Sequence, residues 1–194
     1  LQIDGTIAEY PEIQFSLKMR LGWENASECM VLVELLNALR LSRIALHART
    51  GKQQYKGHPD LEAFQGFYEL CQHPLYYNGD IESLSDIRQI LTRFPLLKGV
   101  FIGRGLLSSP LLAKEFKGNE TFLPEQRMSI YFAFHEELFS AYSQVLQGET
   151  QLLVKMKTLW EYFLPETDRK LLKRIKKSTR LQQYTESVKA IFTS

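Results

Sequence analysis

The first part of the chain repeats a pattern in which a short apolar run stops at a polar turn and a helical pattern follows. Residues 13–21 alternate between apolar and polar side chains, which is typical of a β-strand. Three shorter runs with the composition of buried strands lie at residues 43–47, 75–77 and 100–102. Helical patterns follow these strands at about residues 25–39, 60–71, 84–93 and 106–117. Four strand–loop–helix units in series predict a parallel sheet with right-handed crossovers.

From Pro124 onward the apolar positions recur only with helical spacing. Gly148 and Pro165 interrupt this pattern, so several helices are expected instead of one. The stripes include Tyr131, Phe134, Leu138, Leu152, Met156, Trp160, Ile175, Tyr184 and Val188. They predict the core of a small helical bundle. The sequence therefore favours an α/β domain over residues 1–123 and an all-α domain over residues 124–194.

Both cysteines of the chain, Cys29 and Cys71, fall on the apolar stripes of predicted helices. We interpret them as small buried hydrophobic residues in a reducing compartment. Asn25 with Glu28 resembles a capping box at the start of the first helix. The apolar stripe of that helix is expected to comprise Cys29, Leu32, Leu35, Leu36 and Leu39. No cluster of metal ligands occurs at a recognisable spacing in the sequence, so no metal is expected.

Charge is distributed unevenly along a chain of otherwise ordinary globular composition, with 44% hydrophobic and 24% charged residues. No apolar run approaches the roughly 20 residues that span a bilayer, so no membrane contact is expected. Residues 1–123 carry 13 Lys and Arg against 14 Asp and Glu, whereas residues 124–194 carry 11 against 8. Seven basic residues and no acid lie within Arg169–Arg180. This segment is either a face for a polyanion or a plain solvated helix face.

Polar side chains recur where the predicted strands end. Alternation places Lys18 and Arg20 on one face of the first strand, and His47 and Arg49 on one face of the second. In a barrel, Lys18 and Arg20 would point inward near the C-terminal end of their strand, where barrel enzymes keep their chemistry. The alternatives are an exposed strand with a solvated basic face and a structural role for His47.

Two glycine-bearing turns end the third and fourth predicted strands. Asn78-Gly79-Asp80 follows one strand and Gly103-Arg104-Gly105 follows the other. Glycine lets backbone N–H groups approach a ligand closely, and a helix beginning at the second turn offers its N-terminus to a phosphate. We therefore predict a phosphate-bearing ligand over the top of an α/β barrel. The loop 52–57, which contains Tyr55, has a composition suited to RNA contacts or to a plain surface loop.

The strand-end motifs, taken in order, resemble those of the tRNA-dihydrouridine synthases, flavin enzymes that reduce uridine in tRNA. The motifs are Lys18-Met19-Arg20-Leu21-Gly22-Trp23, His47-Ala48-Arg49-Thr50 with Tyr55-Lys56-Gly57, Asn78-Gly79-Asp80-Ile81 and Gly103-Arg104-Gly105. The resemblance runs over most of the chain. It implies the second half of a TIM (β/α)8 barrel, strands 5–8, in residues 1–123, and a helical tRNA-binding domain in residues 124–194.

The resemblance also implies roles for individual residues. The FMN-binding residues would be Lys18 at the flavin ring, His47 beside the flavin, Asn78, Gly79 and Asp80 at the ribityl–phosphate end, and Gly103 and Arg104 at the phosphate. The residues that contact the substrate base or the RNA would be Arg20, Arg49, Tyr55, Lys173, Arg174, Lys176, Lys177 and Arg180. The implied reaction is hydride transfer from reduced FMN to uracil C6 in a flipped-out uridine, after NAD(P)H has reduced the flavin. The implied protein is cytoplasmic and a monomer at full length.

The chain departs from the family pattern in one respect that concerns catalysis. The proton donor of the family is a cysteine within an Asn-x-Gly-Cys-Pro type motif on the first half of the barrel, and that motif does not occur here. Because four strands cannot close an eight-stranded barrel and the sequence begins at Leu1, we expect a fragment that is inactive alone. The alternatives are another FMN-dependent barrel oxidoreductase, similar to dihydroorotate dehydrogenase, and a non-catalytic RNA-binding paralogue.

Overall fold

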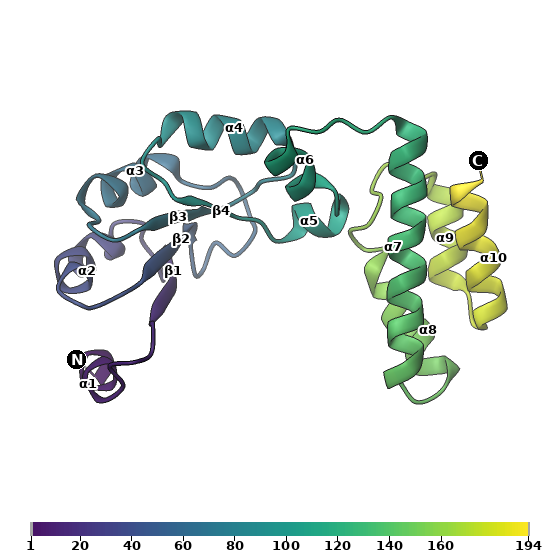
Figure 1. Cartoon of the computed structure of the whole chain (residues 1–194), viewed down its shortest axis with the longest axis horizontal. Coiled ribbons are helices and arrows are strands. Elements are labelled where there is room, and N and C mark those ends of the chain that lie inside the picture. Colours follow the sequence, from purple (N-terminus) through teal and green to yellow (C-terminus); the bar gives the residue numbers. More distant parts are fainter. Residues whose placement is uncertain (1, 194) are drawn as a thin grey trace. The chain divides into compact units, whose positions relative to one another are not determined.

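The computed structural model describes residues 2–193, which form two compact units. The first unit ends at Gly103 and the second begins at Arg104. Figure 1 shows strands and helices in the first unit and helices in the second. No helix among residues 2–193 is long and apolar enough to cross a membrane. The assignment of residues 1–123 and 124–194 to two domains with separate roles stays a prediction.

The first unit is built on a parallel sheet of four strands, so the predicted α/β class is confirmed. The strands run in sequence order and comprise β1 (Ser16–Gly22), β2 (Arg43–Thr50), β3 (Leu75–Asn78) and β4 (Gly99–Phe101). The helices of this unit are α1 (Gln2–Glu9), α2 (Glu28–Asn37), α3 (Leu61–Leu70) and α4 (Leu84–Arg93). Helices α2, α3 and α4 connect successive strands, which is how parallel neighbours are joined.

Apolar side chains on one face of this sheet pack against the connecting helices. Helix α2 lies against β1, and α3 lies against β2. Phe64 of α3 makes edge-to-face contacts with Tyr77 of β3 and with Phe94, which follows α4, at centroid distances of 5.1 and 5.0 Å. In β2, the six residues 44–49 are all buried, as expected for an inner strand covered on both faces.

Two predicted details of the helices were wrong. The buried residues of α2 are Cys29, Val33 and Leu36, whereas Leu32 and Leu35 are 43% and 49% exposed. Cys29 and Leu36 of the predicted stripe are therefore confirmed, and Val33, at spacings of four and three residues from them, takes the place of Leu32 and Leu35. The helix expected at about residues 106–117 is divided at Pro110 into α5 (Arg104–Ser108) and α6 (Leu112–Gly118), because proline lacks the N–H that a helix interior requires.

The second unit, over residues 104–193, has only helices as regular secondary structure. After α5 and α6 come α7 (Pro124–Val145), α8 (Glu149–Leu159), α9 (Arg169–Lys177) and α10 (Leu181–Phe192). Their shared core is the one that the sequence stripes predict, and it includes Tyr131, Leu152, Met156, Trp160, Ile175, Tyr184 and Val188. The Trp160 indole N–H donates to the Tyr184 hydroxyl at 2.9 Å, so the deepest part of this core also satisfies its polar groups.

Polar contacts connect the α5–α6 segment to α7 within the second unit. The Ser109 hydroxyl lies 2.7 Å from the Tyr131 hydroxyl, and Arg127 of α7 forms an ion pair with the buried Glu115 of α6. Because these bonds and the burial of Leu111 place α5 and α6 with the later helices, the compact unit begins at Arg104, before the change in periodicity at Pro124.

Candidate functional site

The register of the sheet places three of the predicted site residues in one row. Arg20 of β1 pairs with His47 of β2, His47 pairs with Asn78 of β3, and Asn78 pairs with Phe101 of β4. Paired residues of parallel strands point to the same face, so Arg20, His47 and Asn78 share the face opposite the buried leucines. The row crosses the C-terminal half of the sheet, where α/β proteins bind their ligands.

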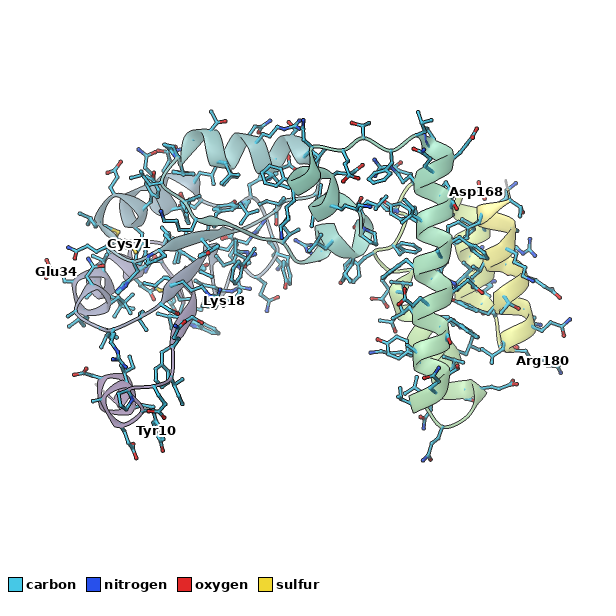
Figure 2. All side chains as sticks on the ribbon, in the orientation of Figure 1. Tyr10, Lys18, Glu34, Cys71, Asp168 and Arg180 are labelled. Atoms are coloured by element: carbon cyan, nitrogen blue, oxygen red, sulfur yellow. The ribbon has the colours of Figure 1, made fainter. Side chains whose placement is uncertain are left out.

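Lys18 lies two residues before Arg20 and pairs with Ala45, so it stands on the same face one step below the row. Its side chain is exposed and is labelled in Figure 2. The structure therefore brings Lys18, Arg20, His47 and Asn78 to one face, of which the alternation in the sequence predicts the placement of Lys18 with Arg20. The row combines cationic and amide groups with one imidazole.

His47 is held in its neutral form by its surroundings. Its side chain is 7% exposed. Burial, together with the positive charges of Arg20, Lys18 and Arg49, lowers the pKa of His47 to about 4, whereas Asp80 acts in the opposite direction. A neutral imidazole carries one donor and one acceptor nitrogen, so His47 can hydrogen-bond to a ligand without adding charge to a site that is already positive.

Arg49 is fully buried and contacts two segments that lie far apart in the sequence. Its guanidinium donates to the carbonyl oxygens of Lys56 and Gly57 at 2.7 and 2.8 Å and to the Asp80 carboxylate at 2.5 Å. Gly57 adopts a positive φ of 65°, which favours glycine in this loop. Within the described part of the chain, Arg49 Nε is buried and has no hydrogen-bond partner. Arg49 therefore fixes the loop after β2 to the turn after β3.

The turn after β3 depends on glycine for a packing reason that the sequence did not reveal. A Cβ atom at Gly79 would overlap the hydroxyl of Tyr77, which is buried directly beneath the turn. Burial and the charge of Asp80 raise the pKa of Tyr77 to about 12. Asn78 is fixed as well, because its amide donates to the Phe101 carbonyl oxygen at 2.8 Å. Helix α4 begins with a capping box, in which the Ser83 hydroxyl accepts from Asp86 N–H at 3.2 Å and the Asp86 carboxylate accepts from Ser83 N–H at 2.8 Å.

The turn after β1 and the loop after β2 form one connected body. The backbone N–H of Gly51 donates to Gly22 O at 2.8 Å, and that of Lys52 donates to Trp23 O at 2.9 Å. Arg20 donates to Thr50 O at 2.7 Å. These bonds continue the β1–β2 pairing into the loops, so the loops are held by backbone contacts as well as by Arg49.

Glu28 stabilises the turn after β1, a role that the sequence indicates only in part. Its carboxylate accepts the N–H groups of Trp23, Glu24 and Asn25 at 2.8, 2.9 and 2.7 Å. These hydrogen bonds lower the pKa of Glu28. The bond from Asn25 N–H is the half of the predicted capping box that the structure contains. The other two bonds arise because the turn folds back over the first residue of α2.

The remaining predicted FMN residues lie where the two units join in sequence. Gly103 follows β4 and is exposed, and Arg104 is the first residue of α5. A Cβ atom at Gly103 would meet no atom within 4 Å, so packing does not require glycine there. Tyr55 is 62% exposed on the loop after β2.

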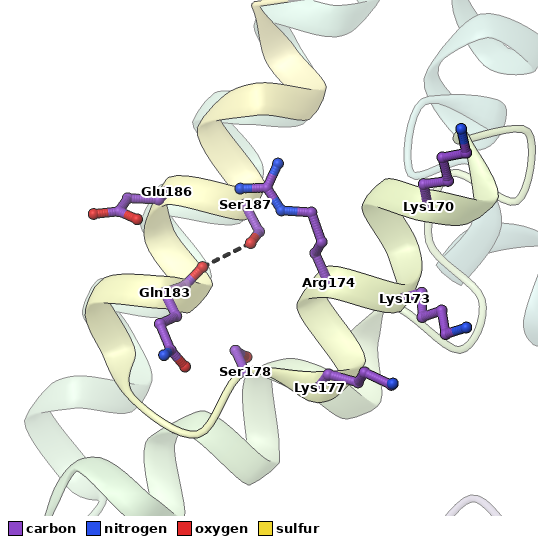
Figure 3. Close-up of a pocket in the computed structure, with 8 residues that line it drawn as sticks. All are labelled: Lys170, Lys173, Arg174, Lys177, Ser178, Gln183, Glu186 and Ser187. Atoms are coloured by element: carbon purple, nitrogen blue, oxygen red, sulfur yellow. Dashed lines mark hydrogen bonds between the residues drawn. The ribbon is translucent and has the colours of Figure 1, made fainter.

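The basic segment in the second unit forms helix α9 and one side of an open cavity of about 430 Å³. The cavity is lined by Lys170, Lys173, Arg174, Lys177, Ser178, Gln183, Glu186 and Ser187. In Figure 3 the Arg174 side chain reaches toward α10, whereas Lys173 and Lys177 point away from it. Lys176 and Arg180 are exposed but do not line the cavity. Buried Ile175 anchors α9 to the core, which leaves its cations to solvent.

Comparison with known proteins connects this arrangement to one family. The sequence model of the family described as Dihydrouridine synthase (Dus) matches residues 6–193. A probable tRNA-dihydrouridine synthase of Rhizobium leguminosarum bv. phaseoli is 36% identical over 100 residues, which cover 51% of this chain and 31% of that protein. A probable tRNA-dihydrouridine synthase of Aquifex aeolicus is 36% identical over 105 residues, which cover 54% of this chain and 33% of that protein. The tRNA-dihydrouridine(16) synthase of Escherichia coli K12 is 28% identical over 110 residues, which cover 56% of this chain and 35% of that protein. The matched part thus spans about a third of the length of these relatives.

Removal of the acidic partner of Arg49 is expected to destabilise the first unit. In Asp80→Ala the buried guanidinium keeps its two carbonyl partners but loses its counter-charge. Breaking a buried ion pair costs about 3–5 kcal/mol, and because Asp80 is 31% exposed we expect about 2–3 kcal/mol, measured by urea unfolding. The control is Glu24→Ala, which removes an exposed ion pair with Lys52 and should cost about 0–1 kcal/mol. Equal losses in the two variants would contradict a structural role for the Arg49–Asp80 pair.

The depressed pKa of His47 predicts that acid weakens the fold. Between pH about 6.5 and about 4, the unfolded chain binds a proton at His47 that the folded chain does not bind. The free energy of unfolding therefore falls as the pH is lowered through this window. Between pH 7 and pH 5 the wild type should lose about 1–2 kcal/mol more stability than His47→Gln. His135, whose pKa burial also lowers, is present in both proteins and cancels from the comparison. If the free energies of unfolding of the two proteins changed in parallel with pH, the pKa of His47 would be the same in the folded and unfolded states, which would contradict the prediction.

Proposed function

The chain belongs to the dihydrouridine synthase family, and we propose that it serves in the reduction of uridine to 5,6-dihydrouridine in tRNA. The observation that carries the proposal is the row Arg20–His47–Asn78, with Lys18 one step below it, on one face of a parallel sheet. Such a row gives hydrogen-bond donors and positive charge for a flat, electron-rich ligand. The names of the relatives supply the substrate class, tRNA.

We propose that the four-stranded sheet is half of a TIM (β/α)8 barrel and that residues 124–194 form a helical tRNA-binding domain. The support for a half barrel is the strand order β1-β2-β3-β4, with helices as the parallel connections. β1 and β4 each pair with one strand among residues 2–193, as the two ends of a half barrel would.

The residues of the row fit an FMN cofactor. The carbonyl oxygens and the phosphate of FMN are acceptors, and this face offers the Lys18 ammonium, the His47 imidazole and the buried, unpartnered N–H of Arg49 Nε. Lys18 would contact the flavin ring with His47 beside it. The chemistry that bound FMN would supply there, after its reduction by NAD(P)H, is hydride transfer to uracil C6. The neutral state of His47 limits the positive charge beside the ring to the neighbouring cations.

The phosphate end of FMN is assigned to the two glycine-bearing turns. Gly103 is open to a phosphate, and Arg104 can pair with it through charge-assisted hydrogen bonds. Asn78 and Gly79 would face the ribityl chain. Asp80 supports this end by holding Arg49, and Arg20 and Arg49 border the place of the substrate base.

The experiment that tests the function uses the protein at the full length of its relatives, with FMN, NADPH and unmodified tRNA. We expect a yellow protein that converts uridine, detected by mass spectrometry of tRNA nucleosides as the gain of two hydrogens. Lys18→Ala should reduce both bound flavin and turnover, because it removes the cation at the ring. A colourless protein that binds tRNA would overturn the proposal and favour a non-catalytic RNA-binding role.

Helix α9 is proposed to contact the phosphates of tRNA. Seven basic residues and no acid lie within Arg169–Arg180, and four of the cations line the cavity beside α10. In a variant with Lys173, Arg174 and Lys177 changed to Gln, we expect weaker tRNA binding and a smaller slope of log K against log salt. Each lost phosphate contact should reduce the slope by about 0.7–0.9.

A matched control separates a specific face from net charge. Lys117, Lys155 and Lys189 are exposed on α6, α8 and α10, and their joint change to Gln removes the same charge. This control should bind tRNA nearly as the wild type does. Equal losses in the two triple variants would contradict the assignment of α9 as the binding face, because attraction would then follow net charge alone.

A further inference from the structure

Trp23, in the turn after β1, exposes a large aromatic surface to solvent. Its side chain is 64% exposed, although tryptophan is on average a highly buried residue. A Cβ atom at Gly51 would overlap the Trp23 ring, so the indole lies directly on the backbone of the loop after β2. One part of the ring is therefore supported by the protein, and the rest faces water.

The backbone of Trp23 is fixed on both sides. Its N–H donates to Glu28 at 2.8 Å, and its carbonyl oxygen accepts from Lys52 N–H at 2.9 Å. With its backbone tied at two points and its ring resting on Gly51, the indole loses little further conformational freedom when a ligand covers it. An exposed aromatic ring held in this way is organised for stacking.

The surroundings of Trp23 are charged and not apolar. Glu24, the next residue, forms an exposed ion pair with Lys52, and Glu28 accepts the Trp23 N–H. The adjoining loop, residues 51–58, carries Lys52 and Lys56 and no acid, and it also presents the exposed ring of Tyr55. The exposed apolar residues Val31, Leu32 and Leu35 belong to helix α2, a different element. A protein interface has an apolar core of several side chains, whereas a single-stranded nucleic acid needs an isolated aromatic ring beside cations.

We propose that Trp23 is a stacking platform for an unpaired base of the RNA substrate, with Lys56 beside a flanking phosphate and with Lys52 exchanging its exposed partner Glu24 for another phosphate. This inference rests on the proposed function and deepens it by assigning a base contact outside the row Arg20–His47–Asn78. Stacking on an aromatic ring tolerates any base, so the contact contributes affinity and positioning and does not read the sequence.

The chain contains two tryptophans, which makes the proposal directly measurable. Trp23 is exposed, whereas Trp160 is 2% exposed in the core of the second unit. We would titrate the chain with single-stranded oligouridine, and separately with heparin, which is a polyanion without bases, and follow tryptophan fluorescence. Oligouridine should quench the wild type, heparin should leave the fluorescence unchanged, and Trp23→Phe should abolish the quenching.

Affinity provides a second readout. Trp23→Ala should weaken oligouridine binding about 5- to 150-fold, the range that corresponds to the loss of one stacked base, and should leave heparin binding unchanged. Trp23→Phe should retain most of the affinity, because a phenyl ring still stacks. Val31→Ala removes another exposed apolar side chain of the same unit and should change neither affinity. Circular dichroism checks that each variant is folded.

The outcomes separate this inference from the function on which it rests. If oligouridine binds with unchanged fluorescence and Trp23→Ala retains wild-type affinity, the stacking role is overturned and RNA binding stands. If the wild type binds no RNA, both fail. If Trp23→Ala instead abolishes self-association of the chain at unchanged RNA affinity, Trp23 belongs to a protein contact and the proposal is wrong.

Discussion

The candidate site depends on a buried positive charge at Arg49. A charged side chain with no exposed surface is stable only when hydrogen bonds and a counter-charge replace the water it has lost. Lys56, Gly57 and Asp80 provide these partners from two different loops. The requirements of one guanidinium therefore position the loop that carries Tyr55 relative to the turn that carries Gly79.

The same arrangement determines the electrostatics of the row beside it. Burial keeps His47 neutral, the charges of Arg20, Lys18 and Arg49 lower its pKa as well, and Asp80, in the turn after β3, offsets part of their field. A ligand on this face meets a positive potential with little acid nearby. Arg49 and Asp80 therefore determine both the position of the loops and part of the charge on this face of the sheet.

The sequence predicted the local features well and the contacts between distant segments poorly. Alternation in β1 and the glycine turns identified the residues of the row, because these patterns depend on neighbours in the chain. The burial of Arg49 was not predictable in this way, since its partner Asp80 lies 31 residues further on. The burial of Val33 on α2 also arises only when strands and helices pack together, and so does the burial of the Tyr77 side chain that a Cβ atom at Gly79 would overlap.

The contact between Gly79 and Tyr77 has a consequence for how this family can vary. A ligand-binding loop usually tolerates substitution because it lies outside the core. Here the backbone of the turn rests on a core hydroxyl, so a larger residue at position 79 requires a smaller one at position 77, and that change would open a void against Phe64. Descendants of this sequence should therefore change the two positions together or keep both.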